Sequence, residues 1–192
     1  MLVETLSAGA QEVAPAWAER RRQVDGADTA LFRIVRDIGG SWDATGDRET
    51  VAVYRQASGV DAASLPDWPD PAPRPAGTRT AWRELYADPA ARPYQEVDRF
   101  IFMIEVSVDP AVREDFDHWY TSRHVPDVRP AGLVAARRYE SLDADAVFLT
   151  TYEMDSPSVL SSDALARVRG FDEFAQHVVA VDRVVLHPAA QS

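Results

Sequence analysis

The sequence contains no cysteine, which excludes disulfide bonds, thiolate catalysis and cysteine-ligated zinc. It also lacks any apolar run near the roughly 20 residues that a membrane-spanning helix needs, so no membrane partner is expected. The opening stretch MLVETLSAGAQEVAP has neither a basic segment nor a continuous apolar one, and therefore does not resemble a secretory signal. A cytoplasmic location is the expectation.

Positive charge is scarce. Arginine and lysine together number 20 against 31 acidic residues, giving a formal net charge of −11, and lysine is absent altogether. The only basic cluster, residues 20–22, is too short to follow a nucleic-acid backbone. Because an acidic surface repels phosphate-rich partners, we expect no nucleic-acid binding.

Two further signatures are missing. Gly39-Gly40 alone indicates a turn rather than a phosphate-binding loop. His118 and His124 stand six residues apart and therefore diverge around a helix, so no metal site is predicted.

The second half has a clear alternation of elements. Asp109-Pro110 is a good helix start, and the helix after it carries one apolar stripe. That stripe comprises Val112, Phe116, Trp119 and Tyr120. Strands are predicted at 99–106, 134–140, 146–153 and 178–186, and a second helix within 161–174. The order is β-α-β-β-α-β, a ferredoxin-like unit.

The first half is a weaker copy of this order. Strands are predicted at 1–5, 31–35 and 50–54, helices at 11–24 and 80–86, and a proline-rich loop at 66–75. We therefore predict an α+β fold of two tandem ferredoxin-like (βαββαβ) halves, a degenerate one at 1–92 and a second at 93–192. Each half has a bare sheet face, so the two are expected to close into one intrachain barrel. A homodimer of such barrels is then optional.

The segment from Phe116 to Val128 resembles a pattern of the dimeric α+β barrel superfamily, in particular its EthD-like group. The shared features are a Trp-Tyr pair, a His followed by Pro, a later Gly and an Arg-Arg-Tyr strand. Here they are Trp119-Tyr120, His124-Val125-Pro126, Gly132 and Arg137-Arg138-Tyr139. The resemblance covers about residues 99–187, and the first half has no His-x-Pro. It implies a site in the second half only, in a superfamily of cofactor-free cyclases and monooxygenases, isomerases, haem enzymes and small-molecule binders.

His124 is the first candidate for chemistry. It lies four residues after Tyr120 and continues the inward stripe, where a neutral imidazole can move a proton near neutral pH. The alternative is a core histidine that hydrogen-bonds a backbone carbonyl beside Pro126. Tyr120 is the second catalytic candidate, because its hydroxyl can donate to a developing oxyanion.

Five further residues are predicted to bind substrate, although all five also suit a structural role. Glu105 is either an inward carboxylate with a raised pKa or an edge charge, and the edge charge is preferred. The five are Trp119, Phe116, Tyr139, Tyr152 and Glu105.

The leading hypothesis is a cofactor-free enzyme, of cyclase, isomerase, decarboxylase or oxygenase type. It would act on a small aromatic, phenolic or polyketide-like carbonyl compound through proton transfer by His124. One alternative is a haem-dependent enzyme with His124 or His177 as the axial ligand. The other is a non-catalytic barrel that binds a small apolar or aromatic ligand.

Overall fold

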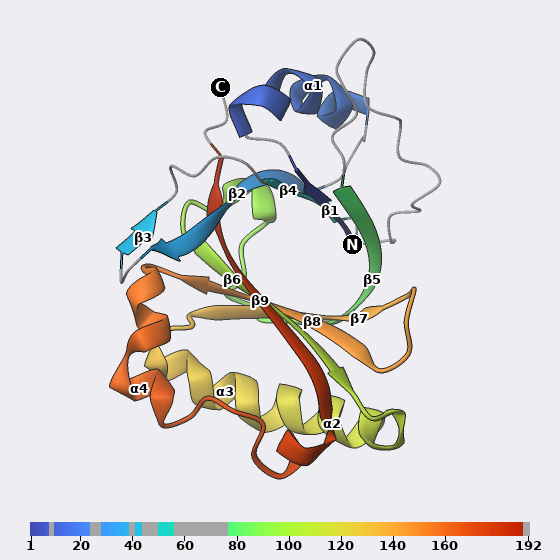
Figure 1. Ribbon diagram of the computed structural model, residues 1–192, viewed down its shortest axis with the longest axis vertical. Coiled ribbons are helices and arrows are strands. Elements are labelled where there is room, and N and C mark those ends of the chain that lie inside the picture. Colours follow the sequence, from blue (N-terminus) through green and yellow to red (C-terminus); the bar gives the residue numbers. More distant parts are fainter. Residues whose placement is uncertain (8–9, 24–27, 39–40, 44–49, 56–76, 190–192) are drawn as a thin grey trace. The chain divides into compact units, whose positions relative to one another are not determined.

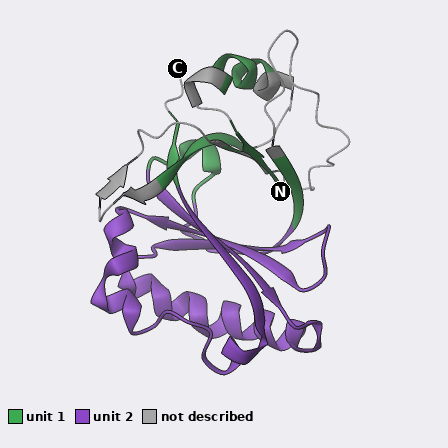
Figure 2. Ribbon diagram, viewed as in Figure 1, with its two compact units in different colours: residues 1–82, 92–98, 186–192 green, residues 83–91, 99–185 purple. Residues whose placement is uncertain are grey.

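The computed structural model describes residues 1–7, 10–23, 28–38, 41–43, 50–55 and 77–189. The chain forms two units (Figure 2): unit 1 holds residues 1–82, 92–98 and 186–192, and unit 2 holds 83–91 and 99–185. The sequence predicted a division between residues 92 and 93. Residues 83–91 belong to unit 2, and residues 93–98 and 186–192 belong to unit 1, so the predicted division stays a prediction. The predicted loop at 66–75 lies outside the described residues.

Unit 1 is a sheet in which β1 lies between β4 and β5. Val3 pairs with Val53 on one side and with Thr80 on the other, and both valines are buried. The strand order is β3-β2-β4-β1-β5, and α1 covers one face of the sheet with Val13 and Trp17 buried (Figure 1). The elements are β1 (Leu2–Leu6), α1 (Ala10–Gln23), β2 (Asp28–Ile38), β3 (Ser41–Asp43), β4 (Thr50–Arg55) and β5 (Gly77–Ala87), which continues into unit 2.

Unit 2 has the predicted order of elements. Its strands are arranged β5-β7-β8-β6-β9, with β6 and β7 both antiparallel to β8. The helices lie on one face of this sheet (Figure 1). The strands are β6 (Phe100–Val108), β7 (Ala135–Ser141), β8 (Val147–Met154) and β9 (Val178–Pro188), and the α-helices are α2 (Arg113–Trp119), α3 (Val125–Val128) and α4 (Asp163–Ala166). The α+β, ferredoxin-like character predicted for the second half is confirmed.

Two helix predictions are wrong. Residues 80–86 belong to β5, because β1 offers a free edge there and Arg79 forms an ion pair with Glu4 at 2.6 Å. Cross-strand pairing of this kind overrides local helix propensity. The second helix of the second half shrinks to α4 between 3-10 turns, and Gly170 adopts φ 127° after it. The tandem duplication and the closed barrel stay predictions. Among the described residues, no helix has the length and hydrophobicity to cross a membrane.

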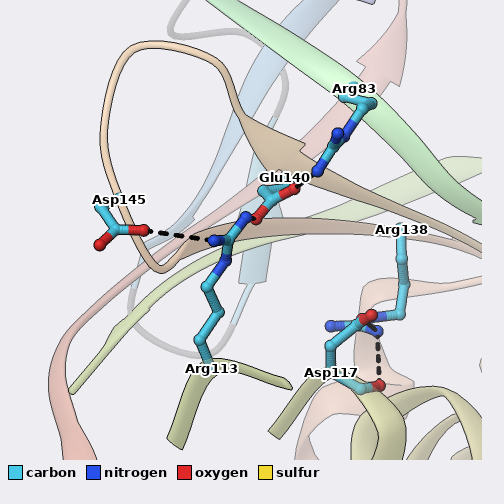
Figure 3. Close-up of polar contacts among 6 residues, drawn as sticks. All are labelled: Arg83, Arg113, Asp117, Arg138, Glu140 and Asp145. Carbon is cyan, nitrogen blue, oxygen red and sulfur yellow. Dashed lines mark hydrogen bonds and ion pairs between the residues drawn. The ribbon is translucent and has the colours of Figure 1, made fainter. Parts of the chain in front are cut away.

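A carboxylate on β7 ties α2 to the sheet. Glu140 accepts hydrogen bonds from Arg83 on β5 and from Arg113 at the first turn of α2 (Figure 3). Arg113 also faces Asp145 at 3.6 Å. Burial alone would raise the pKa of Glu140, but the two guanidinium groups outweigh it and lower the pKa. The ionised carboxylate is therefore the form that stabilises the fold.

We expect Glu140→Gln to lower the free energy of unfolding by about 1–2 kcal/mol at pH 7, because charge-assisted hydrogen bonds are lost. A lowered pKa in the folded state gives stability that is present above the unfolded pKa and lost as pH falls through the folded one. The difference between wild type and variant should therefore shrink below about pH 4. Urea unfolding of wild type and variant at pH 7 and below pH 4 measures this difference. An equal difference in unfolding free energy at the two pH values would contradict the role of the ionised carboxylate.

Candidate functional site

The helical run after α2 widens just before Pro126. Residues Tyr120–His124 form one π-helical turn, in which the N–H of Val125 donates to the carbonyl of Tyr120. Pro126 has no N–H to donate to the preceding turn, which favours such a local irregularity. Single π-helical turns inside helices occur frequently at functional sites. This turn carries both residues predicted to be catalytic, Tyr120 and His124.

Aromatic side chains between this run and the sheet form one cluster centred on Phe116. The Phe116 ring is fully buried and lies 5.5 Å from the ring of Tyr120, between centroids. Its other ring neighbours, at 5.4–6.3 Å, are Phe148, Phe174, Trp119 and Phe171. The predicted stripe thus packs inward, as its spacing requires.

His124 lies at the rim of this aromatic cluster. Its ring stacks on Trp119 at 5.2 Å and meets the edge of Tyr120 at 4.6 Å. It is 8% exposed, against 5% and 2% for those two neighbours. Burial lowers the pKa of His124 to about 4; Asp172 opposes the shift, and Arg138 adds to it. The imidazole is therefore neutral at physiological pH.

Beneath His124, two hydroxyl groups meet. The hydroxyl of Tyr152, on β8, donates to that of Tyr120 at 3.3 Å. Burial, followed by Tyr120, raises the pKa of Tyr152 well above its ordinary value, so Tyr152 stays protonated. Among the described residues, the structure shows no acceptor for the Tyr120 proton.

Arg138 on β7 is the residue that reasoning from the sequence missed. It is completely buried and donates to the carbonyl of Asp117 at 3.0 Å and to the Asp117 carboxylate (Figure 3). It also donates to Thr121. Its guanidinium carbon lies 4.4 Å from the centroid of the Tyr120 ring, a cation–π contact. Within the part of the chain that the structure describes, its Nε and Nη2 have no hydrogen-bond partner.

Strand alternation could have pointed to Arg138. In an Arg-Arg pair on a strand, one side chain must face the helices. Its contacts with Asp117 and Thr121 show that Arg138 is the one that does.

The same alternation separates two predicted residues from the cluster. Tyr139 follows Arg138 on β7 and therefore points to the opposite face of the sheet. Glu105 pairs with Leu149, next to the helix-facing Phe148, and lies on that opposite face too. Burial, and then Asp182, raise the pKa of Glu105. The structure thus brings together Phe116, Trp119, Tyr120, His124 and Tyr152, and places Tyr139 and Glu105 elsewhere.

No group of three or more His, Cys, Asp or Glu side chains among the described residues could hold a metal ion. At His124, the structure places a neutral imidazole beside a phenol, with a buried guanidinium over the phenol ring.

Neither a protein-family model nor a curated protein matches the sequence, but solved structures match its fold. A proposed monooxygenase from Lactobacillus acidophilus NCFM has a TM-score of 0.61 at 12% identity, over 100% of this chain and 95% of that one. A major regulator of staphylococcal pathogenesis gives 0.60 at 8% identity, over 99% and 100%. A ferredoxin-fold protein from Listeria monocytogenes 4b F2365, related to antibiotic biosynthesis monooxygenases, gives 0.56 at 8% identity, over 98% and 94%.

These likenesses show a ferredoxin-like α+β fold. At identities of 8–12%, the likeness shows the fold alone. The matched proteins are described as a proposed monooxygenase, a regulator and a relative of monooxygenases. The function of this chain must therefore be argued from its own residues. The closer resemblance to the EthD-like group stays a prediction.

Proposed function

We propose that the protein is a small-molecule enzyme in which His124 transfers a proton to and from a carbon next to a carbonyl or phenolic group. The observation that carries this proposal is the buried, neutral imidazole with a pKa of about 4, held between Trp119 and Tyr120 on a π-helical turn. A general base must be unprotonated when the substrate arrives, and His124 is unprotonated throughout the physiological range.

The proton-transfer step balances without a co-reactant. A nitrogen of His124 takes the proton from the carbon α to the carbonyl, leaving an imidazolium and an enolate. The hydroxyl of Tyr120 donates a hydrogen bond to the enolate oxygen, while Tyr152 holds Tyr120 in place at 3.3 Å. If the imidazolium first exchanges its N–H with solvent, return to the same carbon gives hydrogen exchange, and return to another carbon gives isomerisation. The low pKa of His124 makes the imidazole a weaker base in the first step and the imidazolium a stronger acid in this return.

The surroundings of His124 favour a flat, apolar substrate. The imidazole is flanked by two aromatic rings, and rings in a binding site stack on planar ligands. Arg138, at 4.4 Å from the Tyr120 ring, adds positive charge behind the hydroxyl that would meet the developing anion. Aromatic ketones and phenolic or polyketide-like acids combine these features.

The proposal assigns no cofactor to this reaction. The haem alternative needs an axial histidine with an open face of porphyrin size. Its two candidate ligands are His124, which is 8% exposed between the rings of Trp119 and Tyr120, and His177, and this alternative stays a prediction. A visible absorption band on adding haem, lost in His124→Gln, would contradict this assignment.

A thermal-shift screen tests where such compounds bind. Aromatic ketones and phenolic acids are compared on wild type, His124→Gln and His118→Gln, a control at an exposed position of α2. We expect at least one compound to stabilise wild type and the control, by about 2.7 kcal/mol at a hundred times its Kd, and His124→Gln clearly less. Equal stabilisation of all three proteins, or of none, would count against a site at His124.

A further inference from the structure

A shallow cleft opens on the helical run just beyond the aromatic cluster. Its volume is about 480 Å³, and it is lined by Pro126, Arg129, Pro130 and Val134. None of these four residues belongs to the aromatic cluster around Phe116. The cleft is therefore a separate feature of unit 2, and the proposed reaction does not use it.

Arg129, the cation of this cleft, forms an ion pair with the buried carboxylate of Asp88. Nη1 of Arg129 lies 3.0 Å from Oδ2 of Asp88, whose side chain is 1% exposed, whereas that of Arg129 is 44% exposed. Asp88 is itself fixed, because its N–H donates to the carbonyl of Ala136 at 2.8 Å and its Oδ1 accepts from the N–H of Ala90 at 2.8 Å. Asp88 thus places a fixed negative charge beside Arg129, and the contact is an ion pair rather than a hydrogen bond, because Oδ2 has no hydrogen-bond partner among the described residues.

Arg129 keeps donors for a ligand. A guanidinium carries five N–H groups in a planar fork, and the ion pair with Asp88 uses the Nη1 end of Arg129. The fork matches the two oxygens of a carboxylate. The rest of the lining, two prolines and a valine, is apolar.

We propose that this cleft binds a small apolar or aromatic molecule that carries a single carboxylate. The formal net charge of −11 supports one negative charge on the ligand rather than two, because the acidic surface penalises each further charge. The carboxylate of such a ligand would accept hydrogen bonds from the Arg129 guanidinium, and its apolar part would contact the prolines and the valine of the cleft. The site does not depend on the proposed reaction at His124, and each can fail without the other.

Titration with benzoate, followed by NMR and calorimetry, tests the proposal, with benzyl alcohol and inorganic phosphate as comparison ligands. We expect saturable binding of benzoate that shifts the signals of Val134 and Arg129, and weaker binding of both comparison ligands. Arg129→Gln should weaken benzoate binding about tenfold or more, and Arg129→Lys by less. The signals of Val134 and Arg129 should shift at the same benzoate concentration in His124→Gln as in wild type, which separates binding in this cleft from binding at His124.

Arg123→Gln is the matched control on the same helical run, since Arg123 is 66% exposed and faces Glu173 at 3.9 Å. It should bind benzoate as wild type does. Arg129→Gln leaves Asp88 without its cation, so Arg129→Lys and the NMR shifts of wild type keep the test decisive if the glutamine variant unfolds. No saturation by benzoate, equal binding of benzyl alcohol, tighter binding of phosphate, or an equal loss in Arg123→Gln would overturn the proposal.

Discussion

Replacing Asp117 by alanine is expected to lower the free energy of unfolding by about 3 kcal/mol, the largest loss of stability that we predict for a single polar side chain. Arg138 is completely buried, and Asp117 supplies its counter-charge through the carboxylate (Figure 3). Removing that carboxylate leaves a buried guanidinium whose Nε and Nη2 already have no partner among the described residues. Thermal unfolding should show a fall in Tm of about 6–12 °C.

The partner substitution separates this explanation from a general loss of packing. Arg138→Met removes the buried charge and leaves Asp117, whose side chain is 35% exposed, to water. We therefore expect Arg138→Met to cost less than Asp117→Ala, and the double variant to be more stable than Asp117→Ala alone. Additive losses in the double variant would mean that the ion pair is not what stabilises this part of unit 2.

Replacing His124 by glutamine is expected to slow proton transfer by about 10²- to 10⁴-fold, the range for removal of a general acid or base. The pH profile of wild type carries a second expectation. Because burial lowers the pKa of His124 to about 4, activity should rise with pH through that value and stay level above about pH 5. Tyr120→Phe should retain the same profile at a lower rate, since it removes the hydrogen bond to the enolate and leaves the base.

The second half could be predicted in detail because its periodicities are strong. The stripe from Phe116 to Tyr120 lies on α2 and the π-helical turn after it. The β-branched run 146–153 forms most of β8. The inward position of His124 followed from its spacing to Tyr120. The widened helical turn itself could not be foreseen, because it depends on how the backbone accommodates Pro126.

What the sequence did not predict arises from contacts distant along the chain. Residues 80–86 have helix-forming side chains, but pairing with β1, some 75 residues away, makes them a strand. Arg138 could be placed in a strand, but which face it took depended on the register of β7 against β8. Tyr139 and Glu105 went to the opposite face for the same reason, so two of the seven predicted site residues lie apart from the aromatic cluster.

The central claim is that the neutral His124 moves a carbon-bound proton, and deuterium exchange tests it most directly. Each aromatic ketone or phenolic acid that binds and carries a C–H next to its carbonyl is incubated in D₂O with wild type, His124→Gln or His118→Gln, and loss of that proton signal is followed by NMR. The account predicts exchange above the buffer rate with wild type and His118→Gln, and a rate near that of buffer with His124→Gln. Exchange at the wild-type rate in His124→Gln, or no exchange by wild type with any compound that binds, would contradict it.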